Sequence, residues 1–226
     1  MNNPLLALLL ATALPASAQS DYEYRMEIGA GIGLVAYEGD FNGSITHGMQ
    51  PMASAVLRRT FNPYMALRFS AAYGKLKGSS KNVKTHMPEY VDNPYEFSNS
   101  LVDVSATYEY NFWPYGTGRD YRGAQRLTPF IFAGLGATYA SGSGNNVFTA
   151  NVPLGVGVKY KVATRLNLGI EWAMHFSMND NLDGVKDPYG IQSTGMFKNT
   201  DCYSMLQLTL TYSFMPKCRT CHNDDD

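Results

Sequence analysis

The chain has 226 residues, of which 45% are hydrophobic, 13% aromatic and only 16% charged. Its 18 Lys and Arg nearly balance its 19 Asp and Glu, so the formal net charge is −1. This balance shows no basic excess of the kind that nucleic-acid binding requires, and we expect no nucleic-acid partner. No apolar run after the N-terminal segment approaches the roughly 20 residues of a membrane-spanning helix. The 21 Gly and 16 Tyr also depart from an ordinary soluble helical protein, so the composition favours a β-rich chain.

The N-terminal segment has the features of a secretion signal. An apolar run over residues 5–14 is followed by Pro15 and then by Ala16-Ser17-Ala18. A short apolar core that ends in an A-x-A site is typical of a cleavable signal peptide. We therefore expect residues 1–18 to be a signal peptide and the mature chain to lie outside the cytoplasm.

Alternation of apolar and polar residues predicts eight strands in the mature chain. In the last of them, for example, Leu206 and Leu208 alternate with Gln207 and Thr209. In chain order, the expected strands cover approximately residues 22–37, 52–61, 65–75, 101–112, 128–140, 152–162, 165–176 and 205–214.

Longer and shorter connections alternate between these strands. The turns at 62–64 and 161–164 are short and the connection at 113–127 is of medium length, whereas the longer loops cover 38–50, 78–96, 141–151 and 176–202. An even number of antiparallel strands with longer loops at one end is the layout of an outer-membrane barrel. We therefore expect an all-β fold, an eight-stranded antiparallel transmembrane β-barrel of the OmpA/OmpX type. It should span residues 19–214, with residues 215–226 as a periplasmic C-terminal tail and the longer loops outside the cell.

The residue types on the two faces of each strand distinguish a membrane barrel from a soluble one. The apolar faces end in aromatic residues such as Tyr24 and Tyr212, which resembles an aromatic girdle, whereas the polar faces combine Gly with single charges such as Glu23 and Arg25. A water-facing surface would carry more Lys and Glu, so the apolar face should meet lipid and the polar face should line the lumen. Unpaired charges in a narrow lumen are costly, so we expect these charges to form a paired plug. The expected lumen ion network consists of Glu27, Arg58, Arg68, Glu109, Lys159, Arg165 and Glu171.

Support for catalysis in the sequence is weak. The glycines at 29, 31 and 33 lack the following helix of a phosphate loop, and inward glycines that make room for bulky charged side chains in a narrow lumen explain them better. The four His show neither metal-ligand spacing nor a hydrolase motif. We therefore expect no enzymatic activity, no cofactor, no metal and no small-molecule substrate, and a lipase-like or protease-like barrel is the remaining alternative.

Three cysteines lie near the C-terminus. Cys218 and Cys221 form a C-x-x-C pair after the last strand, and Cys202 precedes that strand. The periplasm permits oxidation, so the pair could be a disulfide, two thiols, a metal clip with further ligands or a redox pair. A redox pair usually belongs to a βαβ unit, which this sequence lacks. Cys202 should lie at the opposite end of the barrel from the pair.

The order of several motifs resembles a known family. These motifs are EIGAGIGL at 27–34, YEGD at 37–40, AVLRRTFNP at 55–63, YEYNF at 108–112, TPFIFAGLG at 128–136, YSF at 212–214 and PKCRTCH at 216–222. Together they resemble the PorG-type outer-membrane barrels of Bacteroidota over most of the mature chain. The resemblance implies a non-enzymatic component of the type IX secretion machinery, associated with the periplasmic ring of PorK and PorN. The alternative is a surface adhesion or defence barrel that acts through its long outer loops.

The 113–127 connection is longer than an inner turn requires, and we interpret it as a docking site. Excess loop length is where binding usually resides, and aromatic residues beside Arg are typical of protein interfaces. Trp113 and Tyr115 could instead only mark the membrane interface. With the tail, the expected docking residues are Trp113, Tyr115, Arg119, Tyr121, Arg122, Arg126, Cys218 and Cys221. The expected partners are the lipid bilayer of the outer membrane and periplasmic ring proteins of the PorK/PorN type, with both termini in the periplasm.

Overall fold

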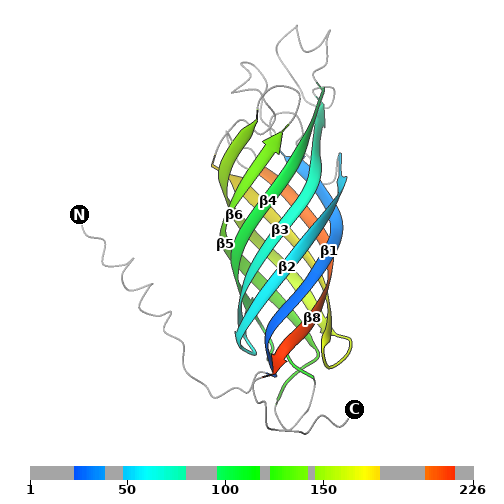
Figure 1. Ribbon diagram of the computed structural model, residues 1–226, viewed down its shortest axis with the longest axis vertical. Helices are drawn as coiled ribbons and strands as arrows, with labels where there is room; N and C mark the ends of the chain where they lie inside the picture. Colours follow the sequence, from blue (N-terminus) through cyan, green and yellow to red (C-terminus); the bar gives the residue numbers. More distant parts are fainter. Residues whose placement is uncertain are drawn as a thin grey trace, which may run out of the picture.

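The computed structural model describes residues 23–38, 48–79, 96–117, 123–141, 146–178 and 202–216. Eight antiparallel strands form a closed barrel (Figure 1), which confirms the predicted all-β fold. The strands are β1 (Tyr24–Glu38), β2 (Gln50–Asn62), β3 (Met65–Ser79), β4 (Glu96–Asn111), β5 (Leu127–Ser141), β6 (Val147–Lys161), β7 (Leu166–Ser177) and β8 (Cys202–Pro216). The described residues contain no helix that is long and apolar enough to cross a membrane. The expected signal peptide and most of the tail lie outside the described residues.

Each strand pairs with its neighbour in sequence, and β1 also pairs with β8, which closes the sheet. Glu27, for example, lies opposite Arg58 on β2 and opposite Ser213 on β8. The start of β1 and the end of β8 therefore lie at one end of the barrel, together with the connections after β2, β4 and β6 (Figure 1). We call this end the terminal end, and the opposite end, which carries the connections after β1, β3, β5 and β7, the loop end.

The connection between β5 and β6 is shorter than predicted. The sequence predicts a long loop over 141–151, but β5 ends at Ser141 and β6 begins at Val147. Thr149 and Asn151 are buried inside the barrel. The prediction was wrong because polar residues near a strand end resemble a loop in sequence, although in this barrel they face the lumen. The strands β3, β4 and β8 also extend farther toward the loop end than predicted.

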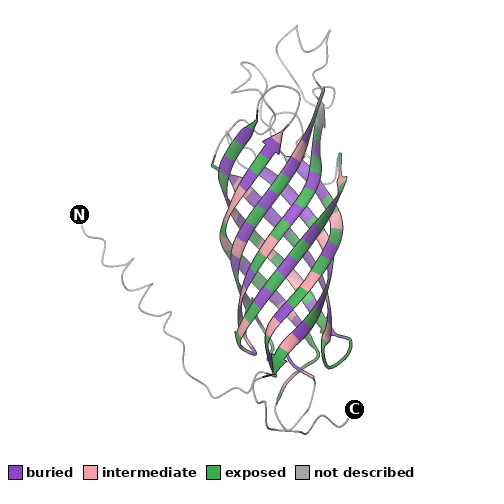
Figure 2. Cartoon of the chain, viewed as in Figure 1, coloured by how far each residue is buried: buried purple, intermediate pink, exposed green. Residues whose placement is uncertain are grey.

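Burial alternates along the strands (Figure 2). Outward apolar side chains are exposed, and Ile32, Leu135 and Phe148 have exposed fractions of 69%, 67% and 71%. Inward charged side chains such as Arg58 and Glu109 are buried. In water so much exposed apolar surface would promote aggregation, whereas in a bilayer it meets hydrocarbon. The outer surface therefore suits a membrane and the interior is polar.

Inward glycines make room for aromatic rings. A Cβ atom on Gly155 would lie 2.3 Å from Cζ of Phe132, and one on Gly157 would lie 2.6 Å from Cζ of Phe130. Both rings are buried and stack with their centroids 5.8 Å apart. These positions agree with the expectation that glycine widens a narrow lumen, although the groups they accommodate are rings rather than charges.

The start of β1 departs from the predicted faces. Tyr24 is buried and Arg25 is exposed, the reverse of the prediction, while Glu27 is buried as expected. Next to these residues, Met215 on β8 has a φ of 59°. This left-handed conformation is unusual for a residue with a side chain and interrupts the regular pleat. Alternation therefore fails where β1 begins and β8 ends.

Candidate functional site

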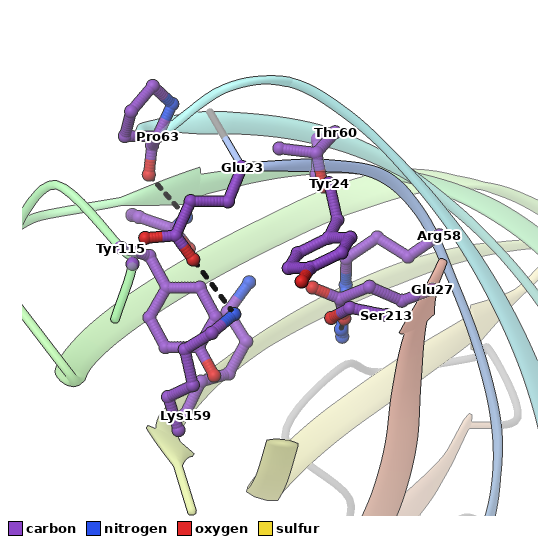
Figure 3. Close-up of a pocket in the computed structure, with 13 residues that line it drawn as sticks. Glu23, Tyr24, Glu27, Arg58, Thr60, Pro63, Tyr115, Lys159 and Ser213 are labelled. Carbon is purple, nitrogen blue, oxygen red and sulfur yellow. Dashed lines mark hydrogen bonds and ion pairs between the residues drawn. The ribbon is translucent and has the colours of Figure 1, made fainter. Parts of the chain in front are cut away.

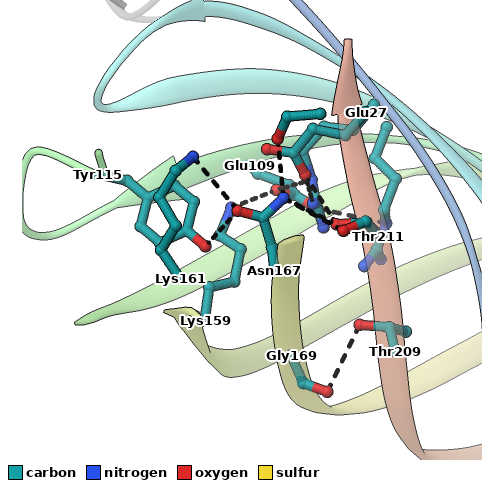
Figure 4. Close-up of polar contacts among 12 residues, drawn as sticks. Glu27, Glu109, Tyr115, Lys159, Lys161, Asn167, Gly169, Thr209 and Thr211 are labelled. Carbon is teal, nitrogen blue, oxygen red and sulfur yellow. Dashed lines mark hydrogen bonds and ion pairs between the residues drawn. The ribbon is translucent and has the colours of Figure 1, made fainter. Parts of the chain in front are cut away.

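Glu109 lies at the centre of a charged cluster in the terminal half of the lumen (Figure 4). Its Oε2 atom is 2.8 Å from both Arg58 Nε and Lys159 Nζ, and its Oε1 atom is 3.4 Å from Arg68 Nε. Arg58 and Arg68 are opposite each other on β2 and β3, where two like charges alone would repel. The carboxylate from β4 neutralises this repulsion because it contacts both guanidinium groups.

Two further acids complete the cluster. Glu27 pairs with Arg58 and accepts a hydrogen bond from Thr211 Oγ1 at 3.1 Å. Glu171 pairs with Arg68 and accepts one from Gln207 Nε2 at 2.8 Å. Three acids thus face three bases, and this balance compensates the cost of burying the charges. The structure brings together all predicted network residues except Arg165.

Aromatic rings cover the cluster on the inside of the wall. The Arg68 guanidinium carbon is 4.2 Å from the centroid of the Phe132 ring, and Lys159 Nζ is 4.4 Å from that of Phe130. These are cation–π distances, and they leave the two bases in contact with rings as well as with acids. The charges and the rings therefore pack against one another inside the barrel at this level.

Arg165 lies outside the lumen, contrary to the prediction. It belongs to the turn between β6 and β7 and is exposed, and its guanidinium donates to the hydroxyl groups of Tyr212 at 3.2 Å and Tyr24 at 3.4 Å. The prediction failed because Arg165 precedes β7, so strand alternation does not apply to it. Lys161, at the end of β6, faces inward in its place, with Nζ 3.9 Å from Glu23 Oε2. Lys161 follows Lys159 by two residues, and strand alternation places two such residues on the same face. This spacing is the sequence signal that identifies Lys161 as inward.

Tyr115 closes the terminal end of the lumen (Figure 3). Its hydroxyl donates to Asn167 Oδ1 at 2.9 Å, and the amino groups of Lys159 and Lys161 are 5.6 Å and 5.4 Å from its ring centroid. Burial raises the pKa of the Tyr115 hydroxyl above its usual range, so the donor stays protonated. The sequence predicts a partner contact or a membrane marker at Tyr115, but the side chain points into the barrel.

The described residues of the connection between β4 and β5, 112–117 and 123–126, are hydrogen-bonded to the opening of the lumen at the terminal end, which we call the mouth. Tyr115 N donates to the Pro63 carbonyl at 3.1 Å. Thr117 donates to Glu23 Oε1 through its backbone N–H at 3.0 Å and through its hydroxyl at 2.5 Å. Gly116 N also donates to the carbonyl of Gln125 at 3.0 Å, across the connection. The described part of the connection is therefore held at the terminal end of the barrel by hydrogen bonds to Pro63 and Glu23.

Two predicted docking residues lie on the outside of this connection. Trp113 has an exposed fraction of 42%, and Arg126 is exposed while its Nε donates to the Thr117 carbonyl at 2.8 Å. The other predicted docking residues lie outside the described residues: Arg119, Tyr121, Arg122, Cys218 and Cys221.

A small polar cavity lies between Tyr115 and the charged cluster (Figure 3). Its volume of about 20 Å³ is enough for a single water molecule. Glu23 Oε2 is buried beside it and has no hydrogen-bond partner among the described side chains. A water molecule in this cavity can thus hydrate the Glu23 carboxylate, but the cavity is too small for an organic substrate.

A second polar cluster occupies the loop half of the lumen, and sequence reasoning missed it. Asp103 Oδ2 accepts hydrogen bonds from Tyr203 Oη at 2.8 Å and from Asn151 Nδ2 at 2.6 Å. His175 Nδ1 is 3.7 Å from the same oxygen, and its ring stacks on Tyr203 with centroids 4.7 Å apart. The position of Asp103 between Val102 and Val104 is a signal of its inward direction, but Asn151 lies in a predicted loop and Tyr203 precedes the predicted start of the last strand.

Apolar side chains surround this second cluster. The buried apolar group consists of Val35, Tyr37, Met52, Ala72, Leu76, Leu101, Ala140, Tyr203 and Met205. Within the described ranges, no three His, Cys, Asp or Glu residues gather in a way that could hold a metal ion.

Solved structures similar to this chain include small outer-membrane proteins. Neisserial surface protein A is 16% identical with a TM-score of 0.47, and the match covers 86% of this chain and 100% of that protein. Ail of Yersinia pestis is 11% identical with a TM-score of 0.46, over 85% of this chain and 100% of that protein. OprG of Pseudomonas aeruginosa is 10% identical with a TM-score of 0.49, over 87% of this chain and 98% of that protein. No curated protein matches the sequence.

A family model matches residues 5–223, a range that includes all eight strands. The family is described as a domain of unknown function, DUF6089. The match therefore covers the charged cluster, the second polar cluster and the connection at the mouth. By this match the chain belongs to the DUF6089 family.

Proposed function

We propose that the chain is a non-enzymatic outer-membrane anchor that docks a periplasmic protein assembly at its terminal end. The observation that carries the proposal is the connection between β4 and β5, whose described residues are hydrogen-bonded at the mouth through Tyr115 and Thr117 and leave Trp113 and Arg126 exposed. The other connections at this end, residues 63–64 and 162–165, are short turns. Length that barrel closure does not need is available for binding.

The packed side chains inside the described part of the barrel support an anchor rather than a pore or an enzyme. The charged cluster and its covering rings occupy the terminal half, and buried apolar side chains surround the second cluster. The cavity at the mouth has room for one water molecule. The exposed apolar belt supports a location in the outer membrane, and the short turns beside the termini support a periplasmic terminal end.

The bound connection also suits docking energetically. A surface that is already ordered loses less conformational entropy when a partner binds. Trp and Arg are residue types that often dominate binding energy at interfaces. In this proposal Trp113 and Arg126 contact the partner, whereas Tyr115 and Glu23 act as positioning residues that hold the connection in place.

The proposed partner is a periplasmic secretion ring. The resemblance to PorG-type barrels supports ring proteins of the PorK/PorN type in a type IX machinery. Arg119, Tyr121 and Arg122 belong to the same connection and would extend the docking surface, and so would the tail with Cys218 and Cys221. Both termini would then be periplasmic.

The docking proposal is tested by co-purification from native membranes after mild crosslinking. Combined Arg119→Ser, Arg122→Ser and Arg126→Ser substitutions should leave the barrel folded and inserted but remove the periplasmic partner. Arg165→Ser is the matched control, because Arg165 is an exposed arginine in a short turn at the same end. Retention of the partner at normal yield by the triple variant would contradict docking here. Recovery of extracellular ligands would favour adhesion or defence through the outer loops.

The topology is tested separately by labelling intact cells. A tag inserted near Gly142, in the connection between β5 and β6, should be labelled, and a tag after Asp226 should not. The reverse pattern would place the terminal end outside the cell and remove the basis for periplasmic docking.

A further inference from the structure

The outer wall of the barrel is hollowed between β4 and β7. An apolar groove of about 540 Å³ crosses the outward face of these four strands. Its position on the membrane-facing surface separates it from the lumen and from the docking connection. Residues that define it include Tyr108, Tyr110, Ala133, Leu154, Trp172 and Met174.

The hollow arises from the sizes of neighbouring outward side chains. Ala133 lies between Tyr108 on β4 and Leu154 on β6 in the strand register, so a small side chain stands between larger ones. Tyr108 and Trp172 project from the wall with exposed fractions of 46% and 36%. Met174 faces outward but is only 5% exposed, which places it deep in the groove. The sequence thus builds a depression with aromatic walls.

The groove runs obliquely across the membrane-facing belt. Tyr110 is next to the last residue of β4, at the terminal end, whereas Phe176 is next to the last residue of β7, at the loop end. Four strands spaced by about 4.8 Å span about 14 Å from the first strand axis to the last. Phe176 also lies four residues beyond Trp172, which shares a row with Tyr110, and four residues add about 13 Å along the strand. The diagonal of the groove is therefore about 20 Å, which fits within a hydrocarbon core of about 30 Å.

We propose that this groove binds one acyl chain of a phospholipid. The lining is apolar apart from the tyrosine hydroxyl groups, and it faces the hydrocarbon region, where acyl chains are the surrounding medium. Tyr108 and Tyr110 lie at the terminal end of the groove, and tyrosine prefers the boundary between hydrocarbon and headgroups. The acyl chain therefore lies in the groove with its carbonyl end near these tyrosine hydroxyl groups and its methyl end toward Met174 and Phe176.

A second copy of this barrel fits the groove less well than an acyl chain does. A two-fold interface places the same patch of both subunits face to face. Two hollows in contact would enclose an empty space, and the side chains that line a void lose packing contacts. A single flexible chain fills the hollow and restores those contacts.

Lipid retention tests this inference. The barrel is reconstituted in phosphatidylethanolamine vesicles and extracted in mild detergent. Native mass spectrometry then measures the mass of the protein with any bound lipid. The wild-type chain should retain one phospholipid per barrel, and Ala133→Phe, which fills the groove, should retain none. Ala71→Phe is the matched control, because Ala71 is an exposed outward alanine on β3, and it should retain the lipid.

Equal retention by wild type and Ala133→Phe, or no retention by wild type, would overturn the inference. A wild-type dimer that Ala133→Phe dissociates would also overturn it and assign the groove to a contact between copies. The shift of folded barrels on unheated gels reports whether each variant is folded. If Ala133→Phe does not fold, Ala133→Met provides the smaller substitution, and it should weaken retention relative to Ala71→Met.

Discussion

The two halves of the lumen are filled by different chemistry. In the terminal half Glu109 is shared among Arg58, Arg68 and Lys159. In the loop half, apolar side chains such as Leu76 and Leu101 are buried to 0% and 1% exposure around Asp103. Buried charges need partners of opposite sign at defined positions, whereas buried apolar groups need mainly the right volume. The two halves should therefore tolerate different substitutions.

The largest effect is expected at the centre of the charged half. Glu109→Gln keeps the volume of the side chain but removes the charge that three bases share. Loss of one partner in a buried ion pair costs about 3–5 kcal/mol, and the free energy of unfolding in vesicles should fall by about this amount. Lys77→Ala, on the exposed face of β3, should change it by less than about 0.5 kcal/mol. Similar values for the two variants would show that the charges are not buried.

The next effect concerns volume in the loop half. Leu76→Ala should lower the free energy of unfolding by about 3 kcal/mol, because it leaves a cavity where a fully buried side chain stood. Leu76→Met keeps the volume and should cost less than about 1.5 kcal/mol. Urea titration of both variants measures the difference. Equal losses would mean that the loop half, like the terminal half, depends on one particular side chain.

A smaller effect is expected for the acid in the loop half. Tyr203→Phe removes a donor to Asp103 that lies at 2.8 Å, while Asn151 continues to donate. A hydrogen bond to a charged group contributes about 1.5–3 kcal/mol, so we expect a loss near the lower limit. Tyr139→Phe, on the outer wall, is the matched control and should be nearly neutral. A loss of unfolding free energy as large as that of Glu109→Gln would show that Asp103 stabilises the barrel as strongly as the charged cluster does.

The smallest effect is expected at the mouth. Tyr115→Phe keeps the ring between Lys159 and Lys161 but removes the hydrogen bond to Asn167. Its cost should be about 1 kcal/mol, and partner recovery in the crosslinking experiment should be retained. Tyr115→Ala also removes the ring and should reduce recovery while the barrel stays inserted. Unchanged partner recovery with Tyr115→Ala would show that docking does not depend on the Tyr115 ring at the mouth.

The strand interiors are well predicted from sequence because one rule governs them. Glu27, Arg58 and Glu171 face the lumen as alternation requires, since a closed sheet gives every strand one inner and one outer face. From these positions the sequence predicts most of the charged cluster. Pairing within the cluster cannot be read in the same way, because it depends on the register between strands.

The failures lie where alternation does not apply. Arg165 precedes its strand, and Tyr115 belongs to a connection that folds back over the mouth, so neither residue has a face that periodicity can assign. The sequence predicts a loop at Asn151 because its segment is polar, although its amide binds Asp103 inside the barrel. Sequence alone gives no distance between residues so far apart along the chain.

The pairing of β1 with β8 also constrains how the barrel is assembled. The contact extends from Tyr24 opposite Pro216 to Glu38 opposite Cys202, so the last strand to be synthesised seals the first. Before residues 202–216 arrive, β1 and β7 each have an edge of unpaired backbone groups that hydrocarbon cannot satisfy. Contacts between distant parts of a chain also form slowly. The chain must therefore reach the membrane complete and protected from aggregation, and its insertion waits for the final strand.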